Sequence, residues 1–170
     1  MTLFIRPETT ADIVAIHALT TEAFRHAAHT SHTEQFINDA LREAGQLTLS
    51  LVADDKGEVV GHVAISPVTL SDGSHGWYGL GPVSVLPERQ SEGIGAGLIH
   101  AALDTLRKEA ATGCVVLGDP GYYARFGFRA NPTLVLPGVP PEYFQSLVFS
   151  GPVPRATVSY HEAFQATGPS

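Results

Sequence analysis

One segment of the chain carries more structural information than any other, and it reads Val83-Ser84-Val85-Leu86-Pro87-Glu88-Arg89-Gln90-Ser91-Glu92-Gly93-Ile94-Gly95-Ala96-Gly97-Leu98. Its apolar beginning, stopped by Pro87, predicts the end of a strand. The glycines that follow permit positive φ and leave no Cβ atom to block a ligand. Apolar residues then recur at helical spacing, which predicts a helix over residues 93–110. The first N–H groups of such a helix are unpaired at the positive end of its dipole, where a phosphate binds.

Two common phosphate-binding motifs do not fit this turn. A Walker A loop requires Gly-Lys followed by Ser or Thr, and the sequence contains no such run. A Rossmann fingerprint requires glycine at the sixth position counted from Gly93, where Leu98 stands. That fingerprint also belongs to the first strand–helix unit of its fold, whereas this turn lies near the middle of the chain. Neither nucleotide motif explains the segment.

The turn resembles motif A of the GNAT superfamily of N-acetyltransferases, whose pattern is Gln/Arg-x-x-Gly-x-Gly/Ala. Gln90, Gly93 and Gly95 match that pattern, after the apolar strand and proline typical of the family. The resemblance implies that backbone amides of the turn bind the pyrophosphate of acetyl-CoA, and that the preceding strand binds the pantetheine arm. The implied cofactor-binding residues are Val83, Ser84, Val85, Gln90, Ser91, Glu92, Gly93, Ile94, Gly95 and Ala96. From the residues alone, the alternative is that the glycines only make the start of the helix flexible and that no ligand binds there.

A second motif follows downstream, Gly118-Asp119-Pro120-Gly121-Tyr122-Tyr123-Ala124-Arg125-Phe126-Gly127-Phe128. It resembles motif B of the same superfamily, a Tyr-x-x-x-Gly-Phe sequence after the next strand. The resemblance assigns Tyr123 as the catalytic acid that protonates the departing CoA thiolate, and a phenol with a reference pKa near 10 suits that task. Packing alone is the other interpretation of Tyr123, and we expect Tyr122, Phe126 and Phe128 to pack in the core. The doubled tyrosine, with Tyr160-His161-Glu162-Ala163-Phe164, is most similar to the YhbS-like bacterial group.

The 170 residues suit one domain, and we expect a single N-acetyltransferase domain over residues 1–170. The fold class expected is α/β (α+β): the GNAT fold, a mixed, mainly antiparallel sheet of about six to seven strands with helices on both faces. Expected strands are Leu3–Ile5, Leu47–Ala53, Val59–Val68, Trp77–Val85, Cys114–Leu117, one near Phe128 and Ala156–Ala163. Expected helices begin at a Thr10 cap, cover Thr33–Ala44 and cover residues 93–110, the last stopped by Gly113.

Composition and charge narrow the function classes. Ten Lys and Arg against 17 Asp and Glu give a net charge of −7, which argues against nucleic-acid binding. A negative field favours a cationic partner instead. One cysteine excludes an internal disulfide, and no apolar run approaches the ~18 to 20 residues of a membrane span. The amino end has no signal-peptide pattern, so we expect a cytoplasmic protein, monomeric or homodimeric, with no membrane partner.

The expected reaction moves an acetyl group from acetyl-CoA directly to a primary amine of a small molecule or peptide, in a ternary complex. The backbone N–H of Val85 or a neighbour is a plausible donor to the thioester carbonyl. The expected strand Trp77–Val85 contains no carboxylate or histidine that could act as a base. By residue type alone, the candidates for a base are Glu22, His26, His29, His62 and His75. A non-catalytic or degenerate acyl-CoA-binding module is the alternative function.

The segment His26-Ala27-Ala28-His29-Thr30-Ser31-His32 has two interpretations. Its histidine spacing would place two imidazoles on one helical face, but no carboxylate or cysteine completes a ligand set, so we expect no metal. The resemblance places the region between the first two helices beside the acceptor. We therefore expect Phe24, His26 and His29 to shape the substrate pocket, with Tyr78 either lining the cavity or packing. We expect Cys114 to be an unreactive core residue, because it lies within an apolar strand and has no adjacent base.

Overall fold

The computed structural model describes residues 3–27 and 30–168. The α-helices are α1 (Ile13–Phe24), α2 (Glu34–Glu43), α3 (Ile94–Lys108) and α4 (Pro120–Tyr123). The strands are β1 (Leu3–Pro7), β2 (Leu49–Asp55), β3 (Glu58–Leu70), β4 (Trp77–Val85), β5 (Gly113–Leu117), β6 (Leu134–Val135), β7 (Phe144–Val148) and β8 (Ala156–Tyr160). None of the helices in this described part of the chain is long and apolar enough to cross a membrane.

The chain divides into two compact units. The first spans Met1–Ser66, Gly81–Leu103 and Glu162–Ser170, and the second spans Pro67–Leu80 and Asp104–His161. The strands follow the order β1-β2-β3-β4-β5-β7, while β8 pairs with β3 and β6 pairs with β8. Pairing is antiparallel at β1–β2, β2–β3, β3–β8 and β5–β7, and parallel at β4–β5 and β6–β8.

In the first unit, a tight turn joins β2 to β3. Lys56 (φ 54°) and Gly57 (φ 90°) both have positive φ, as a two-residue type I′ hairpin requires. The Gly57 N–H donates to Asp54 Oδ1 at 2.7 Å, which holds the turn closed. β2 begins and ends two residues later than the expected strand Leu47–Ala53, and β3 extends the expected strand Val59–Val68 by one residue at its start and two at its end.

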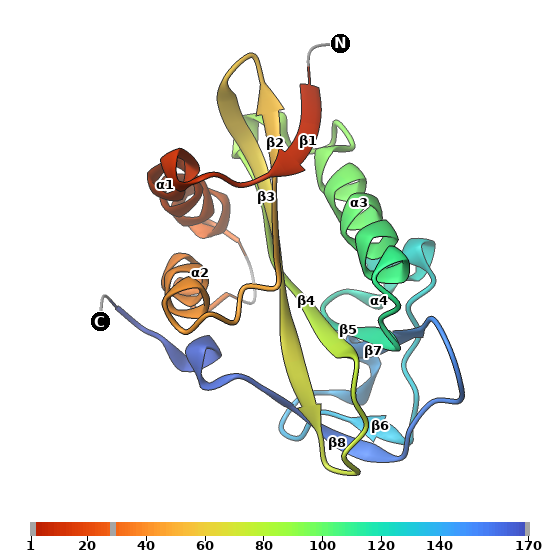
Figure 1. Ribbon diagram of the computed structural model, residues 1–170. Coiled ribbons are helices and arrows are strands. Elements are labelled where there is room, and N and C mark those ends of the chain that lie inside the picture. Colours follow the sequence, from red (N-terminus) through yellow and green to blue (C-terminus); the bar gives the residue numbers. More distant parts are fainter. Residues whose placement is uncertain (1–2, 28–29, 169–170) are drawn as a thin grey trace. The chain divides into compact units, whose positions relative to one another are not determined.

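Helices cover both faces of the strands in the first unit, with α1 and α2 on one face and the start of α3 on the other (Figure 1). The α3 face depends on Gly61 of β3. A Cβ atom there would lie 2.8 Å from Ile94 and 2.9 Å from Leu98, so glycine lets α3 approach the strand closely. On the other face, Ile37 and Leu41 of α2 pack with Ala163.

The core of the second unit forms around the indole of Trp77, which is 2% exposed. Val115 of β5, Phe144 of β7 and Val158 of β8 are buried in the same cluster. The parallel register places Trp77 beside Gly113, and a Cβ atom at Gly113 would lie 2.4 to 2.8 Å from the six-membered ring. Gly113 is therefore a packing glycine under the indole.

The predicted fold class is confirmed, with local corrections. The sheet contains eight strands instead of six or seven, because β7 and the two-residue β6 form inside the Pro-rich tail. The strand expected near Phe128 is an isolated bridge between Arg129 and Ser146. Gly113 does not stop α3, because Ala110 adopts the left-handed conformation (φ 60°) that ends it.

We predict that Gly113→Ala destabilises the protein by about 1 to 3 kcal/mol, the scale of overpacking a closely packed core. The buried Trp77 ring would have to move to admit the methyl group. Urea unfolding would measure the change, with Gly168→Ala as the control because an added Cβ there meets no atom within 4 Å. Equal midpoints for the two variants would contradict the assigned packing.

Candidate functional site

The turn between β4 and α3 has an unusual backbone. A short 3-10 turn, Pro87–Arg89, is followed by Gln90 in an extended conformation (ψ 157°). Ser91 (φ 68°) and Gly93 (φ 87°) then both take positive φ. Left-handed residues between right-handed or extended ones turn successive N–H groups to one side, which is the backbone arrangement of the concave nests that bind anions in other proteins.

The N–H groups of this turn are unpaired inside the protein. Throughout the described ranges, no carbonyl or side-chain oxygen accepts a hydrogen bond from the backbone N–H groups of residues 91–96. The first helical bond of α3 runs from the Gly97 N–H to the Gly93 carbonyl at 3.0 Å. An added Cβ atom at Gly93 would meet no atom within 4 Å, so the space beside the turn is open. We call residues 91–96 the amide turn.

An arginine that the sequence motif does not include holds the amide turn. Arg89 Nη1 lies 2.8 Å from Asp55 in the β2–β3 hairpin, and Arg89 Nε lies 3.0 and 3.2 Å from the two carboxylate oxygens of Glu92. Hydrogen bonds to these two carboxylates raise the pKa of Arg89. The ion pairs neutralise the acidic groups at a place where an anion would bind. The i,i+3 spacing of Arg89 and Glu92 is the sequence signal for this pairing.

The residues of β4 before the turn have different surroundings. Ser84 is 2% exposed, and its hydroxyl donates to Thr20 Oγ1 of α1 at 3.4 Å. Val83 and Val85 are half-buried. The Gln90 side-chain amide donates to the Val85 carbonyl at 3.2 Å, which ties the start of the turn to the end of β4.

In the second unit, α4 presents Tyr123. The helix begins at Pro120, and the Asp119 carboxylate caps it by accepting from the Gly121 N–H at 2.9 Å. The Tyr123 ring lies over Gly118, where a Cβ atom would be 2.5 Å from the ring. Burial raises the pKa of Tyr123 to about 12, so its phenol stays protonated at neutral pH.

The other aromatic residues of this motif divide into two groups. Phe126 and Phe128 are buried, as predicted, and Phe128 meets the edge of the Tyr123 ring with centroids 6.0 Å apart. Tyr122 is only half-buried, and the Arg125 guanidinium lies 4.4 Å above its ring centroid. Tyr122 is therefore a partly exposed cation–π partner and not a core residue.

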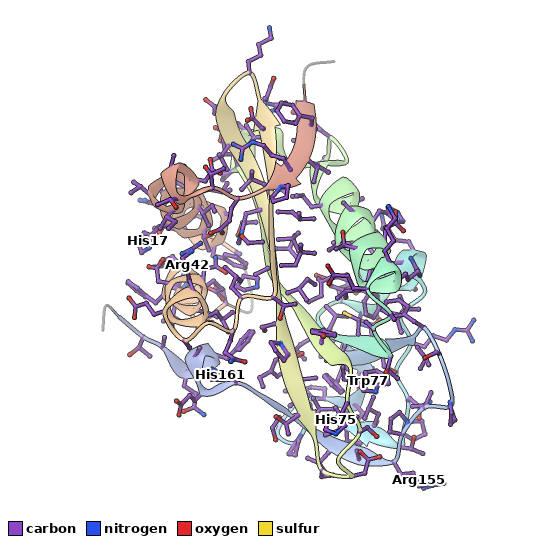
Figure 2. All side chains as sticks on the ribbon, viewed as in Figure 1. His17, Arg42, His75, Trp77, Arg155 and His161 are labelled. Carbon is purple, nitrogen blue, oxygen red and sulfur yellow. The ribbon has the colours of Figure 1, made fainter. Side chains whose placement is uncertain are left out.

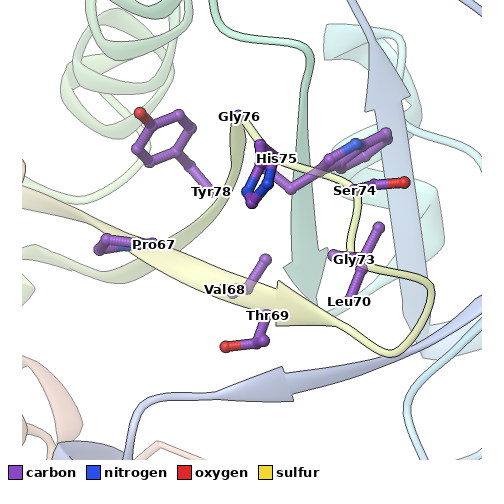
Figure 3. Close-up of a pocket in the computed structure, with 10 residues that line it drawn as sticks. Pro67, Val68, Thr69, Leu70, Gly73, Ser74, His75, Gly76 and Tyr78 are labelled. Atoms are coloured by element: carbon purple, nitrogen blue, oxygen red, sulfur yellow. The ribbon is translucent and has the colours of Figure 1, made fainter.

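The candidate acceptor residues belong to different units of the chain. Phe24 lines a pocket of about 200 Å³ in the first unit with Thr21, Arg25, His32 and Gln35. His26 is exposed beyond the end of α1, and His29 lies outside the described residues. Tyr78 belongs to the second unit, where it and His75 line a pocket of about 300 Å³ along the β3–β4 hairpin (Figure 3). Sequence reasoning missed Gln35 and Arg25, which join Phe24 through the packing of α1 against α2.

The candidate bases also have distinct surroundings. Glu22 pairs with Arg25 on the exposed end of α1. His62 is fully buried, and burial lowers its pKa to about 4. Cys114 is buried as predicted, and burial raises the pKa of its thiol. Among the residues that the structure describes, no group of three His, Cys, Asp or Glu side chains could hold a metal ion.

Comparisons with known proteins agree with these features. Residues 13–128 match the model of the acetyltransferase (GNAT) family. The chain is 39% identical over 128 residues to the N-acetyltransferase YhbS of Escherichia coli K12, covering 75% of this chain and 74% of that protein. A Brucella melitensis GNAT family acetyltransferase, solved with acetyl-CoA, is 50% identical over 95% of this chain and 97% of its own, with a TM-score of 0.86. The E. coli YhbS structure, solved with CoA, is 34% identical over 99% and 94%, also with a TM-score of 0.86. The chain belongs to the GNAT family of acetyltransferases.

Proposed function

We propose that this protein transfers the acetyl group of acetyl-CoA directly to a primary amine of a small molecule or peptide. The observation that carries the proposal is the amide turn, with its consecutive unpaired N–H groups before α3. Two solved relatives that cover almost the whole chain are complexes with acetyl-CoA and CoA, which supports the same ligand here.

The amide turn suits a diphosphate. Backbone N–H groups at a helix start bind an anion through hydrogen bonds and the helix dipole, without a lysine or arginine in direct contact. Open space beside Gly93 leaves room for the phosphate oxygens. The residues proposed for acetyl-CoA are those of the motif from Val83 to Val85 and from Gln90 to Ala96, with the Val85 N–H or a neighbour toward the thioester carbonyl.

Tyr123 is the proposed proton donor to the departing thiolate. Its phenol is protonated throughout the physiological pH range, because burial raises its pKa to about 12. The packing of the ring on Gly118 and against Phe128 fixes the phenol in one orientation. A phenol that is held in one orientation and carries its proton before the reaction can act as a general acid toward the thiolate.

The proposed acceptor is an amine that is protonated in solution and loses this proton before its nitrogen attacks the thioester. The net charge of −7 attracts such molecules. The pocket at Phe24 offers an aromatic wall with polar groups from Thr21 and Gln35. An acyl-CoA-binding module without catalysis is the second candidate, because β4 carries no carboxylate that could serve as a base. Release of free thiol from acetyl-CoA in the presence of a panel of amines separates the two, since a binding module releases none.

Tyr123→Phe is expected to lower kcat by ~10²- to 10⁴-fold, the scale of general acid catalysis, while CoA binding stays unchanged. Thiol release measures the rate, and calorimetry measures CoA affinity. Tyr122→Phe is the matched control, since it removes the same hydroxyl group from the neighbouring ring, whose centroid lies 5.1 Å from that of Tyr123. Equal rates for both variants would remove the acid role from Tyr123.

Gly93→Ala is expected to weaken CoA binding by ~5- to 30-fold, because the left-handed conformation costs an L-residue about 1 to 2 kcal/mol and the Cβ atom enters the anion space. Gly151→Ala is the control. Its φ is also positive (78°) and an added Cβ also meets no atom within 4 Å, so it shares the strain without the site. Calorimetric titration with CoA would show unchanged affinity for both if the diphosphate binds elsewhere.

Arg89→Gln is expected to weaken CoA binding by about two- to fivefold, the scale of exposed charge pairs, because it leaves Glu92 unpaired beside the anion. Adding Glu92→Gln in the same chain restores most of the affinity, and raising the salt concentration narrows the difference. The measurement is CoA titration at low and high salt. A double variant that binds as weakly as the single one would contradict the electrostatic role of Arg89.

A further inference from the structure

A layer of polar side chains is buried where an apolar face is expected. In the first unit, Thr20 of α1, Asn38 of α2, His62 and Ser66 of β3 and Ser84 of β4 are all 0 to 2% exposed. His62 and Ser66 lie on the same face of β3, opposite to the face on which Gly61 meets α3. Burying polar groups has a cost unless they are hydrogen-bonded, so such a layer calls for a functional account.

The outer end of this layer is a chain of hydrogen bonds. His62 Nε2 lies 2.7 Å from Ser50 Oγ of β2, and Ser50 Oγ is in turn hydrogen-bonded to Glu8 Oε1. Arg42 of α2 binds both oxygens of that carboxylate, at 2.8 and 3.0 Å. Figure 2 shows Arg42 on α2. Glu8, Arg42 and Ser50 line a surface pocket of about 340 Å³, so the outer end of the chain reaches solvent.

Counting protons along this chain assigns the tautomer of His62. Glu8 is ionised, because Arg42 and Ser50 hold its pKa below the usual value in spite of partial burial. Ser50 therefore donates its single hydroxyl proton to Glu8 and accepts the Nε2–H of His62. His62 Nδ1 is left as an unprotonated nitrogen. Within the described ranges Nδ1 has no hydrogen-bond partner, and it is buried.

The inner end of the layer reaches β4. The strands β3 and β4 are neighbours in the sheet, and the Leu86 N–H, directly after β4, donates to the Val60 carbonyl of β3 at 3.0 Å. His62 and Ser84 are each two residues away from this hydrogen-bonded pair, and both are buried. Ser84 lies between Val83 and Val85, the residues proposed for the pantetheine arm.

We propose that His62 is the buried proton acceptor for the amine, with Ser50 and Glu8 as positioning residues that fix its tautomer. The inference rests on the proposed function. The neutral amine nitrogen bonds to the acetyl carbon as the carbon–sulfur bond breaks, and one proton leaves the nitrogen through a water molecule for His62 Nδ1. The thiolate takes a proton from the Tyr123 phenol. His62 later releases its proton to solvent, and Tyr123 regains one.

The connectivity excludes a different use of the same residues. In a hydrolase triad the carboxylate binds the histidine and the histidine takes the serine proton. Here the Ser50 hydroxyl donates its hydrogen bond to the Glu8 carboxylate and not to the histidine, so Ser50 is not an activated nucleophile. The Glu8 charge reaches His62 through Ser50 and favours the imidazolium, whereas Arg42 disfavours it. Burial keeps the ring neutral before reaction, with its pKa lowered to about 4.

The test compares His62→Gln, Ser50→Ala and Glu8→Gln with His17→Gln, a control whose imidazole lies on α1 with a 39% exposed side chain (Figure 2). The substrate is a weakly basic amine that is already neutral at pH 6.5. His62→Gln is expected to lower kcat by ~10²-fold, the lower scale of general base catalysis, with CoA affinity unchanged. Its rate is expected to rise with pH from 6.5 to 9 as hydroxide replaces the base, while the wild-type rate stays level. Ser50→Ala and Glu8→Gln give smaller losses of the same kind.

A His62→Gln variant that matches His17→Gln in rate and pH profile would overturn the role of His62. Nitrogen-15 NMR of the unmodified protein tests the hydrogen-bond assignment without any variant, because protonated Nε2 and bare Nδ1 differ in chemical shift. A His62 ring protonated at Nδ1 would also overturn the proposal. Wild-type protein that releases no thiol with any amine would instead overturn the proposed function, and the NMR result would then still decide the tautomer.

Discussion

Unsatisfied backbone hydrogen-bond donors are the constraint on which the proposed function of this protein depends. The amide turn leaves the N–H groups of residues 91–96 without partners in the described structure, although unpaired backbone donors are rare in folded proteins. Positive φ at Ser91 and Gly93 holds the donors on one side, and Arg89 ties the turn to the β2–β3 hairpin. These contacts favour a turn that is already formed before a ligand arrives, and a preformed site requires little ordering of the chain on binding.

This arrangement explains how an acidic protein can bind a polyanion. The net charge of −7 argues against phosphate binding if only side chains are counted. In the proposed site the attraction comes instead from the partial positive charge of peptide groups, which the composition does not show. Arg89 contributes by neutralising Asp55 and Glu92, and it need not touch the ligand. The same acidic surface remains available to attract an amine.

The parts of the fold and of the candidate site that the sequence predicts are local ones. The amide turn and the Tyr123 motif each depend on residues within a short stretch, so their patterns are visible before the structure is known. The chain Glu8–Ser50–His62 joins residues 42 and 12 positions apart, and only strand register brings them together. The sequence does not predict β7, because prolines lie on both sides of this short segment. In the structure, β7 pairs with β5 in a regular antiparallel register. Gly113 and Gly118 leave room for the rings of Trp77 and Tyr123, which pack directly on them. The sequence shows the two glycines but does not show which side chains pack against them.

The close packing of α3 on β3 means that a substitution in β3 can affect the amide turn. Gly61 has no side chain, yet Ile94 of the amide turn and Leu98, one helical turn later, lie directly against it. Any side chain at this position would displace or tilt the beginning of α3. The N–H groups of the amide turn would then point in a different direction. Natural variation in a strand interior could therefore alter coenzyme selectivity while the motif itself stayed intact.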